Sequence, residues 1–335
     1  MSVRIADIFN PTTFGRKAQE AQLQLNRFLN SGIAVMDPEL NKQFQAGALT
    51  ALVNVYSSLA IKEPRYSNDD PSDLNTTHGK IDNLQQTARV AARNDSWALM
   101  RLARELADAD PVGAITNRIG QFWASDDEQR LLTSLLGILA DNVANDGSDM
   151  LVDVSTDAAG AVVEAERIGG DLVIDGLQTM GDHKDALTAL AIHSQIHSRL
   201  QKQNLIEYIP ATDSTIAFQS YLGRRLIVDD TLPAVAGTNR ITYTCVMFGP
   251  GAVLAGSGKV AKPSELDSNP DAGNGGGQDK IYSRVSNAWH PNGFNFTSTT
   301  VAGQAPTYAE LNLAANWDRI MERKHIPIAF LKVND

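Results

Sequence analysis

Residues 110 to 142 read DPVGAITNRIGQFWASDDEQRLLTSLLGILADN, and this stretch sets the architecture of the chain. Asp110 and Pro111 supply an N-cap followed by proline at the first helical position. We expect one helix, roughly 45 Å long at 1.5 Å per residue, although Ser125 and Glu128 form a capping box at which a second helix would begin. Apolar residues recur along it with the spacing of one helix face: Ile115, Ile119, Phe122, Leu131, Leu135, Ile138 and Leu139.

Other segments have helix or strand patterns. Ser96 followed by Leu99, Leu102, Ala103 and Leu106 predicts a helix of about three turns that ends near Asp108. Residues 183–203 predict a second helix with a basic end, and Thr307 with Glu310 caps a third that contains Trp317. The run ITYTCVMF at 241–248 predicts a largely buried strand, and IPIAFLKV at 326–333 predicts a closing strand.

Long polar stretches separate these elements. Residues 15–30 resemble a short amphipathic arm, and an apolar stretch follows at 46–61. About 34 residues from 62 to 95 then carry few large apolar side chains, which is unusual inside a compact domain. Two interpretations stay open for them, a disordered linker or an extended hairpin arm lying on another subunit. Residues 263–280 are rich in Gly, Asn, Asp and Pro and predict a long exposed loop.

Composition limits the possible functions. With 335 residues and 43% hydrophobic content, the chain is long enough for about two globular domains. The formal net charge is −10, which disfavours a protein that grips nucleic acid by neutralising phosphates. The single Cys245 excludes an intramolecular disulfide, and no apolar run reaches the ~20 residues of a membrane span.

No motif in the chain specifies catalysis or a cofactor. His193 and His197 have the spacing of a zinc-binding helix, but Ser194 stands where a zincin needs glutamate. Residues 249–259, GPGAVLAGSGK, miss the register of a phosphate-binding loop and predict turn and loop. Acidic runs at 69–73 and 142–149 lack the ligand order of a calcium loop. Cys245, inside an apolar strand, is expected to be a core residue.

The order of these features resembles the tailed-bacteriophage major capsid proteins of the Hong Kong 97 type. The resemblance rests on the Asp110-Pro111 helix, on ALAIHSQIHSRLQKQNLI at 189–206, on YLGRRLIVDDTLP at 221–233 and on the C-terminal NWDRIMERKHIPIAFLKVN. It spans roughly residues 40 to 335 and is most specific between 110 and 235. It implies an α+β capsid fold with an N-terminal arm, an extended loop, a peripheral domain with a long spine helix, and an axial domain.

By this resemblance the chain divides into successive parts. The implied boundaries are an arm at 1–45, the start of the peripheral domain at 46–61, the extended loop at 62–95, peripheral domain at 96–154 with its spine helix at 110–142, axial domain at 155–300, and a return to the peripheral domain at 301–335.

The implied function is a coat protein that assembles through pentamers and hexamers into an icosahedral shell around double-stranded DNA. Implied partners are further copies of the chain and scaffold, portal and decoration proteins, with no membrane and no sequence-specific contact to DNA. The protein would be made in the host cytoplasm and reside in the virion, and no enzymatic activity, metal or cofactor is expected. Two alternatives are an encapsulin-like compartment shell and a metal-dependent hydrolase using His193 and His197.

Charged side chains in the extended segment are the candidates for contacts between subunits. Opposite charges there suit ion pairs that fix the register of neighbouring copies more than they add affinity, since each exposed pair contributes about 0 to 1 kcal/mol. The candidates are Arg65, Asp69, Asp70, Asp73, Lys80, Asp82, Arg89 and Arg93.

Overall fold

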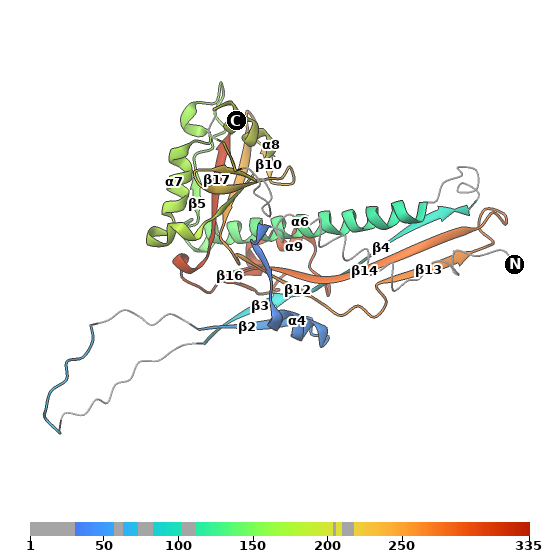
Figure 1. Cartoon of the computed structure of the whole chain (residues 1–335), viewed down its shortest axis with the longest axis horizontal. Helices are drawn as coiled ribbons and strands as arrows, with labels where there is room; N and C mark the ends of the chain where they lie inside the picture. Colours follow the sequence, from blue (N-terminus) through green and yellow to red (C-terminus); the bar gives the residue numbers. More distant parts are fainter. Residues whose placement is uncertain (1–30, 57–62, 73–82, 102–110, 204–205, 210–217) are drawn as a thin grey trace.

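The computed structural model describes residues 31–56, 63–72, 83–101, 111–203, 206–209 and 218–335. Figure 1 shows three parts: a compact body around one sheet, a long helix that runs beneath it along an elongated second sheet, and a narrow hairpin that points away from both. Helices and strands both contribute to the two bodies, so the α+β prediction is confirmed. None of the helices in the described ranges combines the length and apolarity needed to cross a lipid bilayer.

The long helix, α6, is one uninterrupted element from Pro111 to Asn145. Its 35 residues span about 52 Å, and the capping box at Ser125 does not divide it. Leu131, Leu135 and Ile138 are buried as predicted. Phe122 was expected to be buried but is 41% exposed, because it lies at the edge of the contact with the second sheet, 5.5 Å from the ring of Trp97.

The compact body is built on an eight-stranded sheet in the order β5-β17-β11-β6-β9-β8-β7, with β10 paired to β11. The middle strands β11 and β17 are antiparallel over seven residue pairs, from Thr242↔Asn334 to Phe248↔Ile328. The strands are β5 (Leu151–Asp153), β6 (Ala189–Ile192), β7 (Glu207–Ile209), β8 (Phe218–Tyr221), β9 (Arg224–Val228), β10 (Ala234–Ala236), β11 (Ile241–Phe248) and β17 (Ile328–Asn334).

The two faces of β11 belong to two different hydrophobic clusters. Cys245 and Met247 pack with α7 (Gly170–Gln178) and α8 (Ser194–Lys202) in one cluster. Val246 and Phe248 pack with the second half of α6 in the other. Residues alternate between the faces of a strand, so the predicted burial of ITYTCVMF on both sides is confirmed.

The elongated sheet is organised by β14, a 14-residue strand from Gln278 to Pro291. On one edge it pairs with β4 from Met100↔Gln278 to Ala91↔Asn287. On the other edge it pairs with β12 and β13, and β1 joins the outer side of β12 in parallel. These strands are β1 (Ala34–Met36), β4 (Ala91–Met100), β12 (Val253–Ser257) and β13 (Ser264–Asn269).

Smaller elements make up the rest of the described residues. The hairpin of Figure 1 consists of β2 (Thr50–Tyr56) and β3 (Asn83–Arg89), and β15 (Phe294–Phe296) pairs with β16 (Trp317–Arg319). Two further α-helices are α4 (Pro38–Gln45) and α9 (Tyr308–Leu311), and short 3₁₀ turns lie at Glu164–Glu166, Gly181–Ala186, Ala314–Asn316 and Arg323–His325.

Several sequence-based predictions of secondary structure are wrong. The helix expected after Ser96 is strand β4 up to Met100, since ten backbone pairs with β14 outweigh the local helical spacing; Leu102, Ala103 and Leu106 lie outside the described residues. The loop expected at 263–280 is wrong in part: residues 264–269 and 278–280 are paired strands of the β13–β14 hairpin, and 270–277 form the turn between them.

Two further helix predictions are wrong in part. Residues 183–203 form a 3₁₀ turn, strand β6 and the shorter helix α8, because Leu190 and Ala191 are recruited into the sheet beside β11. The capping box of Thr307 with Glu310 is present, but it starts only the four-residue α9. Trp317 begins β16 rather than lying in a helix. The closing strand is confirmed as β17.

Gly137 on α6 lies where the C-terminal segment crosses the helix. A Cβ there would be 2.1 Å from the carbonyl oxygen of Leu311 and 2.4 Å from Nε1 of Trp317, which itself donates a 2.8 Å hydrogen bond to that carbonyl. We expect Gly137→Ala to lower the free energy of unfolding by about 1–3 kcal/mol through overpacking, measured by urea denaturation. Val143→Ala, at a 49% exposed position of the same helix, is the control and should change stability by about 0.5 kcal/mol or less. Equal effects of the two substitutions would contradict the crossing contact.

Candidate assembly interface

The β2–β3 hairpin projects from the rest of the molecule (Figure 1). Its strands pair antiparallel from Thr50↔Arg89 to Tyr56↔Asn83. Beyond them, all the described residues of the connecting segment, 63–72, are exposed. We call residues 50–89 the arm. The described residues 63–72 therefore bury almost nothing against the rest of the described chain.

The base of the arm is held by a buried polar anchor. The side chain of Gln86 on β3 is 0% exposed. Its amide nitrogen donates to Oδ1 of Asn292 at 2.9 Å, and its amide oxygen accepts from the backbone N–H of Gly293 at 3.2 Å. Next to it, the backbone N–H of Thr87 donates to Oδ1 of Asn295 at 3.0 Å. These bonds hold the base of the arm against residues 292–295, and so fix the direction in which the arm projects.

Apolar packing supports the same anchor. Ala51 on β2 and Ala88 on β3 are fully buried against Leu40 and Phe44 of α4. Helix α4 is capped by Asp37, whose carboxylate accepts hydrogen bonds from the backbone N–H groups of residues 39 and 40. The arm therefore starts from a rigid platform rather than from a loop.

The charged candidates for subunit contacts fall into three groups. Arg65, Asp69 and Asp70 are exposed on the arm, and hydrogen bonds from the hydroxyl and backbone N–H of Ser72 lower the pKa of Asp70. Asp73, Lys80 and Asp82 lie outside the described residues.

The other two candidates, Arg89 and Arg93, contact their own chain. Arg89 donates to the backbone carbonyls of Gly303 and Gln304 at 2.7 and 3.0 Å. Arg93 on β4 forms an ion pair with Asp127 of α6 at 2.8 Å and also contacts Asp126.

Arg93 belongs to a mostly buried polar cluster between β4, β14 and α6, which was not predicted from the sequence. The guanidinium lies 5.5 Å above the ring of Trp123, and Asp127, 1% exposed, also accepts from Asn287 of β14 at 2.9 Å. One turn further on, Arg130 donates to the carbonyl of Pro306 at 2.6 Å, and burial lowers its pKa to about 10. The signal in the sequence was the DDEQR run within an otherwise apolar helix. Removing one member would leave a buried charge unpaired, so the cluster fixes the register of α6 on β4 and β14.

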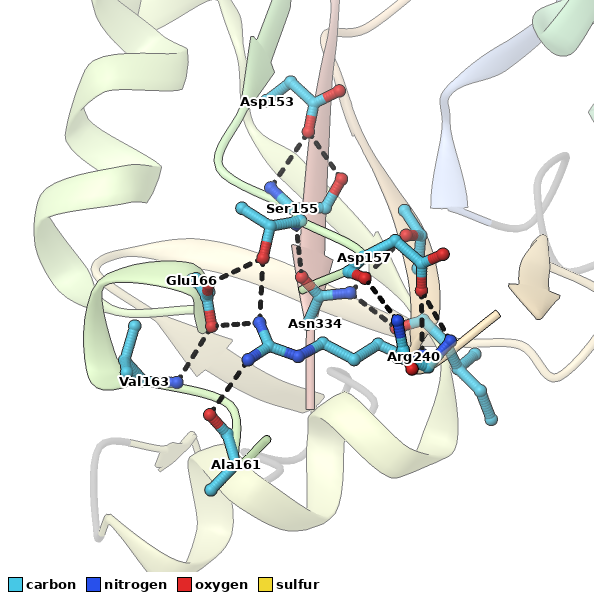
Figure 2. Close-up of polar contacts among 12 residues, drawn as sticks. Asp153, Ser155, Asp157, Ala161, Val163, Glu166, Arg240 and Asn334 are labelled. Atoms are coloured by element: carbon cyan, nitrogen blue, oxygen red, sulfur yellow. Dashed lines mark hydrogen bonds and ion pairs between the residues drawn. The ribbon is translucent and has the colours of Figure 1, made fainter. Parts of the chain in front are cut away.

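A second network closes the end of the compact body (Figure 2). Arg240, immediately before β11, donates to Glu166 at 2.5 Å and to the Thr156 hydroxyl at 2.8 Å. Its other terminal nitrogen donates to the carbonyl of Ala161 at 2.9 Å. One side chain thus holds the whole segment from 156 to 166, which carries no long secondary structure of its own.

Two other side chains in Figure 2 secure the neighbouring strand ends. Asp157 accepts the backbone N–H groups of residues 238, 239 and 240 at 2.8 to 3.0 Å, which lowers its pKa. Asn334, near the C-terminus, accepts from the backbone N–H of Thr156 at 2.7 Å and donates to the carbonyl of Ile241 at 2.9 Å. The network therefore joins β17, β11 and the 156–166 segment, three regions far apart in sequence.

The structure places the candidate metal and nucleophile residues in structural roles. His193 precedes α8 and caps it, with Nδ1 accepting from the backbone N–H of Gln195 at 3.2 Å, so the pair with His197 does not share a helix face in the predicted way. His197 instead contacts Gln219. Among the described residues, no group of three His, Cys, Asp or Glu side chains is placed to hold a metal ion.

Cys245 and the glycine-rich stretch also serve the fold. Burial raises the pKa of the Cys245 thiol to about 12, which keeps it protonated and unreactive. Residues 249–252 form the predicted turn, but 253–257 are strand β12 rather than loop, so no helix N-terminus follows the glycines to receive a phosphate.

Comparison with known proteins identifies close parallels. Residues 107–327 match the family described as "Major capsid protein 13-like". The major capsid protein of Bacillus phage SPP1 is 32% identical over 336 residues, which cover 98% of this chain and 97% of that protein. The capsid of Ralstonia phage GP4 superimposes with a TM-score of 0.56 at 9% identity, over 90% of this chain and 86% of that one. The capsid of cyanophage Pam1 gives 0.53 at 10% identity, over 86% and 85%.

We expect Gln86→Leu to destabilise the base of the arm. Leucine fills a similar volume but leaves the buried groups of Asn292 and Gly293 without partners, a loss of about 1–3 kcal/mol. Hydrogen exchange of the β2 and β3 amides should accelerate accordingly. Gln85→Leu is the matched control, because Gln85 is the neighbouring residue on the exposed side of the same strand. If both variants exchange at the wild-type rate, Gln86 is not the anchor.

The network around Arg240 predicts a specific acid sensitivity. The hydrogen bond from Arg240, followed by those from Thr156 and Val163, lowers the pKa of Glu166 from 4.5 to about 2. A lowered folded-state pKa means that this carboxylate stabilises the fold fully above pH 4.5 and that the contribution is lost as the pH falls towards 2.

Glu166→Gln should therefore flatten this part of the stability profile, measured as the melting temperature against pH. Glu322→Gln, at an exposed carboxylate, should leave the profile as in the wild type. An unchanged acid limb in Glu166→Gln would exclude Glu166 as its source.

Proposed function

The chain belongs to the major capsid protein 13-like family, and on that basis we propose that its arm contacts a neighbouring copy in the shell. The protein is the major capsid protein of a tailed phage, a structural component of the virion that assembles into a multimeric shell. Its fold is that of the Hong Kong 97-type capsid proteins. The family and the full-length relative are phage capsid proteins, so the encapsulin-like and hydrolase alternatives are set aside.

The exposed segment at the end of a rigid hairpin is the observation that carries this proposal. A subunit that tiles a closed shell needs head-to-tail contacts, which use different patches on the two partners. An arm that leaves its own body adds contact area to a neighbour without enlarging the core. Arg65, Asp69 and Asp70 lie on the described part of the arm, where opposite charges favour one register of pairing between copies.

The same proposal assigns the parts of the subunit to the domains of the capsid fold. We assign the eight-stranded body to the axial domain, and α6 with the elongated sheet to the peripheral domain. This assignment differs from the boundaries implied by the resemblance, because it moves β12, β13 and β14 out of the axial domain expected at 155–300 and brings β17 into it. Arg93 and Arg89 then act at the junction of arm and peripheral domain, through contacts within their own subunit, rather than at the rim between subunits.

We also propose, from the family membership, how the subunits assemble and which proteins they contact. Copies form pentamers and hexamers that close into an icosahedral shell, with scaffold, portal and decoration proteins encoded separately. The subunit is made in the host cytoplasm, has no catalytic role and encloses DNA without binding a particular sequence. The formal net charge of −10 supports the last point, because a negative protein does not attract phosphates through its overall charge.

Shortening the arm tests the proposal. We expect replacement of residues 57–82 by a short glycine-serine turn between Tyr56 and Asn83 to leave the subunit folded, because the Gln86 anchor and both bodies lie outside the deletion. Circular dichroism and the melting temperature should stay close to the wild type. Shells and capsomers of the wild-type chain, seen by negative-stain microscopy and sedimentation, should be lost.

A surface control separates charge from the arm itself. Arg65→Glu should lower the yield of shells, whereas Lys184→Glu, exposed on the compact body, should not. Each exposed pair contributes only about 0 to 1 kcal/mol, so the effect of Arg65→Glu should be smaller than that of the shortened arm. Normal shells from the shortened chain would overturn the role of the arm and leave the family membership intact.

A further inference from the structure

The turn between β13 and β14 combines strain, exposure and a reactive sequence. The strands pair up to Asn269↔Gln278, which leaves residues 270–277, PDAGNGGG, at the tip of the hairpin. Asn274 has a positive φ of 55° and the following Gly275 has a φ of 91°. Both residues are exposed. In Figure 1 this tip lies at the opposite end of the molecule from the β2–β3 hairpin.

The backbone of the turn leaves the reactive atoms free. Gly276 donates to the carbonyl of Gly273 at 3.2 Å, and Gly277 donates to that of Ala272 at 2.9 Å. Among the described residues, neither the N–H of Gly275 nor the side-chain amide of Asn274 has a hydrogen-bond partner. Gly275 has no Cβ, so nothing on its own residue blocks the approach of its nitrogen to Cγ of Asn274, and a Cβ built there meets no atom within 4 Å.

The chain contains a second Asn–Gly pair, which serves as an internal comparison. Asn292 and Gly293 lie in the turn after β14, and both are tied to Gln86. The amide oxygen of Asn292 accepts from Gln86 at 2.9 Å, and the N–H of Gly293 donates to Gln86 at 3.2 Å. For this pair to react, the hydrogen bond from the N–H of Gly293 must first break, and the bond at Oδ1 holds the side chain of Asn292 in place. Sequence alone does not distinguish the two pairs, but the tertiary contacts do.

We propose that Asn274 is a site of spontaneous deamidation in the native protein, and that Asn292 is protected from the same reaction by the arm anchor. The backbone nitrogen of Gly275 loses its proton to solvent base and attacks Cγ of Asn274, forming a C–N bond. The C–N bond to the side-chain amide breaks, and ammonia leaves with a proton from water. Water then hydrolyses the cyclic imide at either carbonyl to give aspartate or isoaspartate. No oxidant or metal takes part.

The product changes the charge of the hairpin tip with time. A neutral amide becomes a carboxylate beside Asp271 in the same turn, and the isoaspartate form also lengthens the backbone by one carbon. Glycines 273, 275 and 277, all at positive φ, let the turn absorb this longer path without disturbing the paired strands. The modification therefore alters the charge of an exposed hairpin tip of the subunit while leaving the paired strands intact.

Peptide mapping by mass spectrometry tests the proposal on assembled particles of the full chain. Particles and urea-denatured chain are incubated in parallel at neutral and mildly alkaline pH, and the deamidated fractions of the peptides containing Asn274 and Asn292 are followed over time. In denatured chain the two sites should react at similar rates. In particles Asn274 should react about tenfold faster than Asn292 or more, because at least one hydrogen bond protects the second pair.

The outcomes decide between the alternatives. A rate at Asn274 that rises with pH, gives both aspartate and isoaspartate, and exceeds that at Asn292 only in particles supports the proposal. Asn274→Gln should abolish the acidic species that accumulates on isoelectric focusing. Equal rates of the two sites in particles, or an Asn274 that stays intact there while it reacts in denatured chain, would overturn it.

Discussion

The central pair of strands, β11 and β17, is the constraint on which the rest of this structure depends. Both strands are buried on both faces, so one face of the pair closes the core under α7 and α8 and the other closes the core over α6. Because the last strand of the chain is one of the two, neither core is complete until the C-terminal residues are in place. The compact body and α6 are therefore folded as one unit, and their relative orientation is set by side chains on a shared sheet rather than by a linker.

Charged side chains inside the subunit and charged side chains on the arm lie in different environments. Inside the subunit, Arg93 lies between the carboxylate of Asp127 and the ring face of Trp123, and Arg240 donates hydrogen bonds to Glu166 and to the carbonyl of Ala161. Such groups add little net stability, but mispairing them is strongly unfavourable. They fix the register of α6 and the path of the 156–166 segment. On the described outer part of the arm, residues 63–72, the charged side chains are exposed.

The sequence predicted the elements whose local pattern and tertiary environment agree. The long helix, the doubly buried strand at 241–248, the closing strand and the Thr307 capping box all appear. The prediction failed where a long-range partner decided the outcome. Leu99 lies in a strand because β14 offers ten pairing positions to β4. Part of 263–280 is strand because residues 264–269 pair with the other edge of β14. Strand pairing across such separations leaves no trace in local spacing.

The candidate interface was predicted at the level of a segment and not of its side chains. Polarity and length alone marked residues 62–95 as an arm or linker, and resemblance gave the capsid fold, because both depend on composition and order along the chain. Which charged residues turn inward was decided only by tertiary structure: Arg65 stays on the arm while Arg93 is buried against α6, although the two look alike in sequence. The physical reason is that burial of a charge depends on partners from distant elements, here Asp127 and Asn287, and only folding brings these within hydrogen-bond distance.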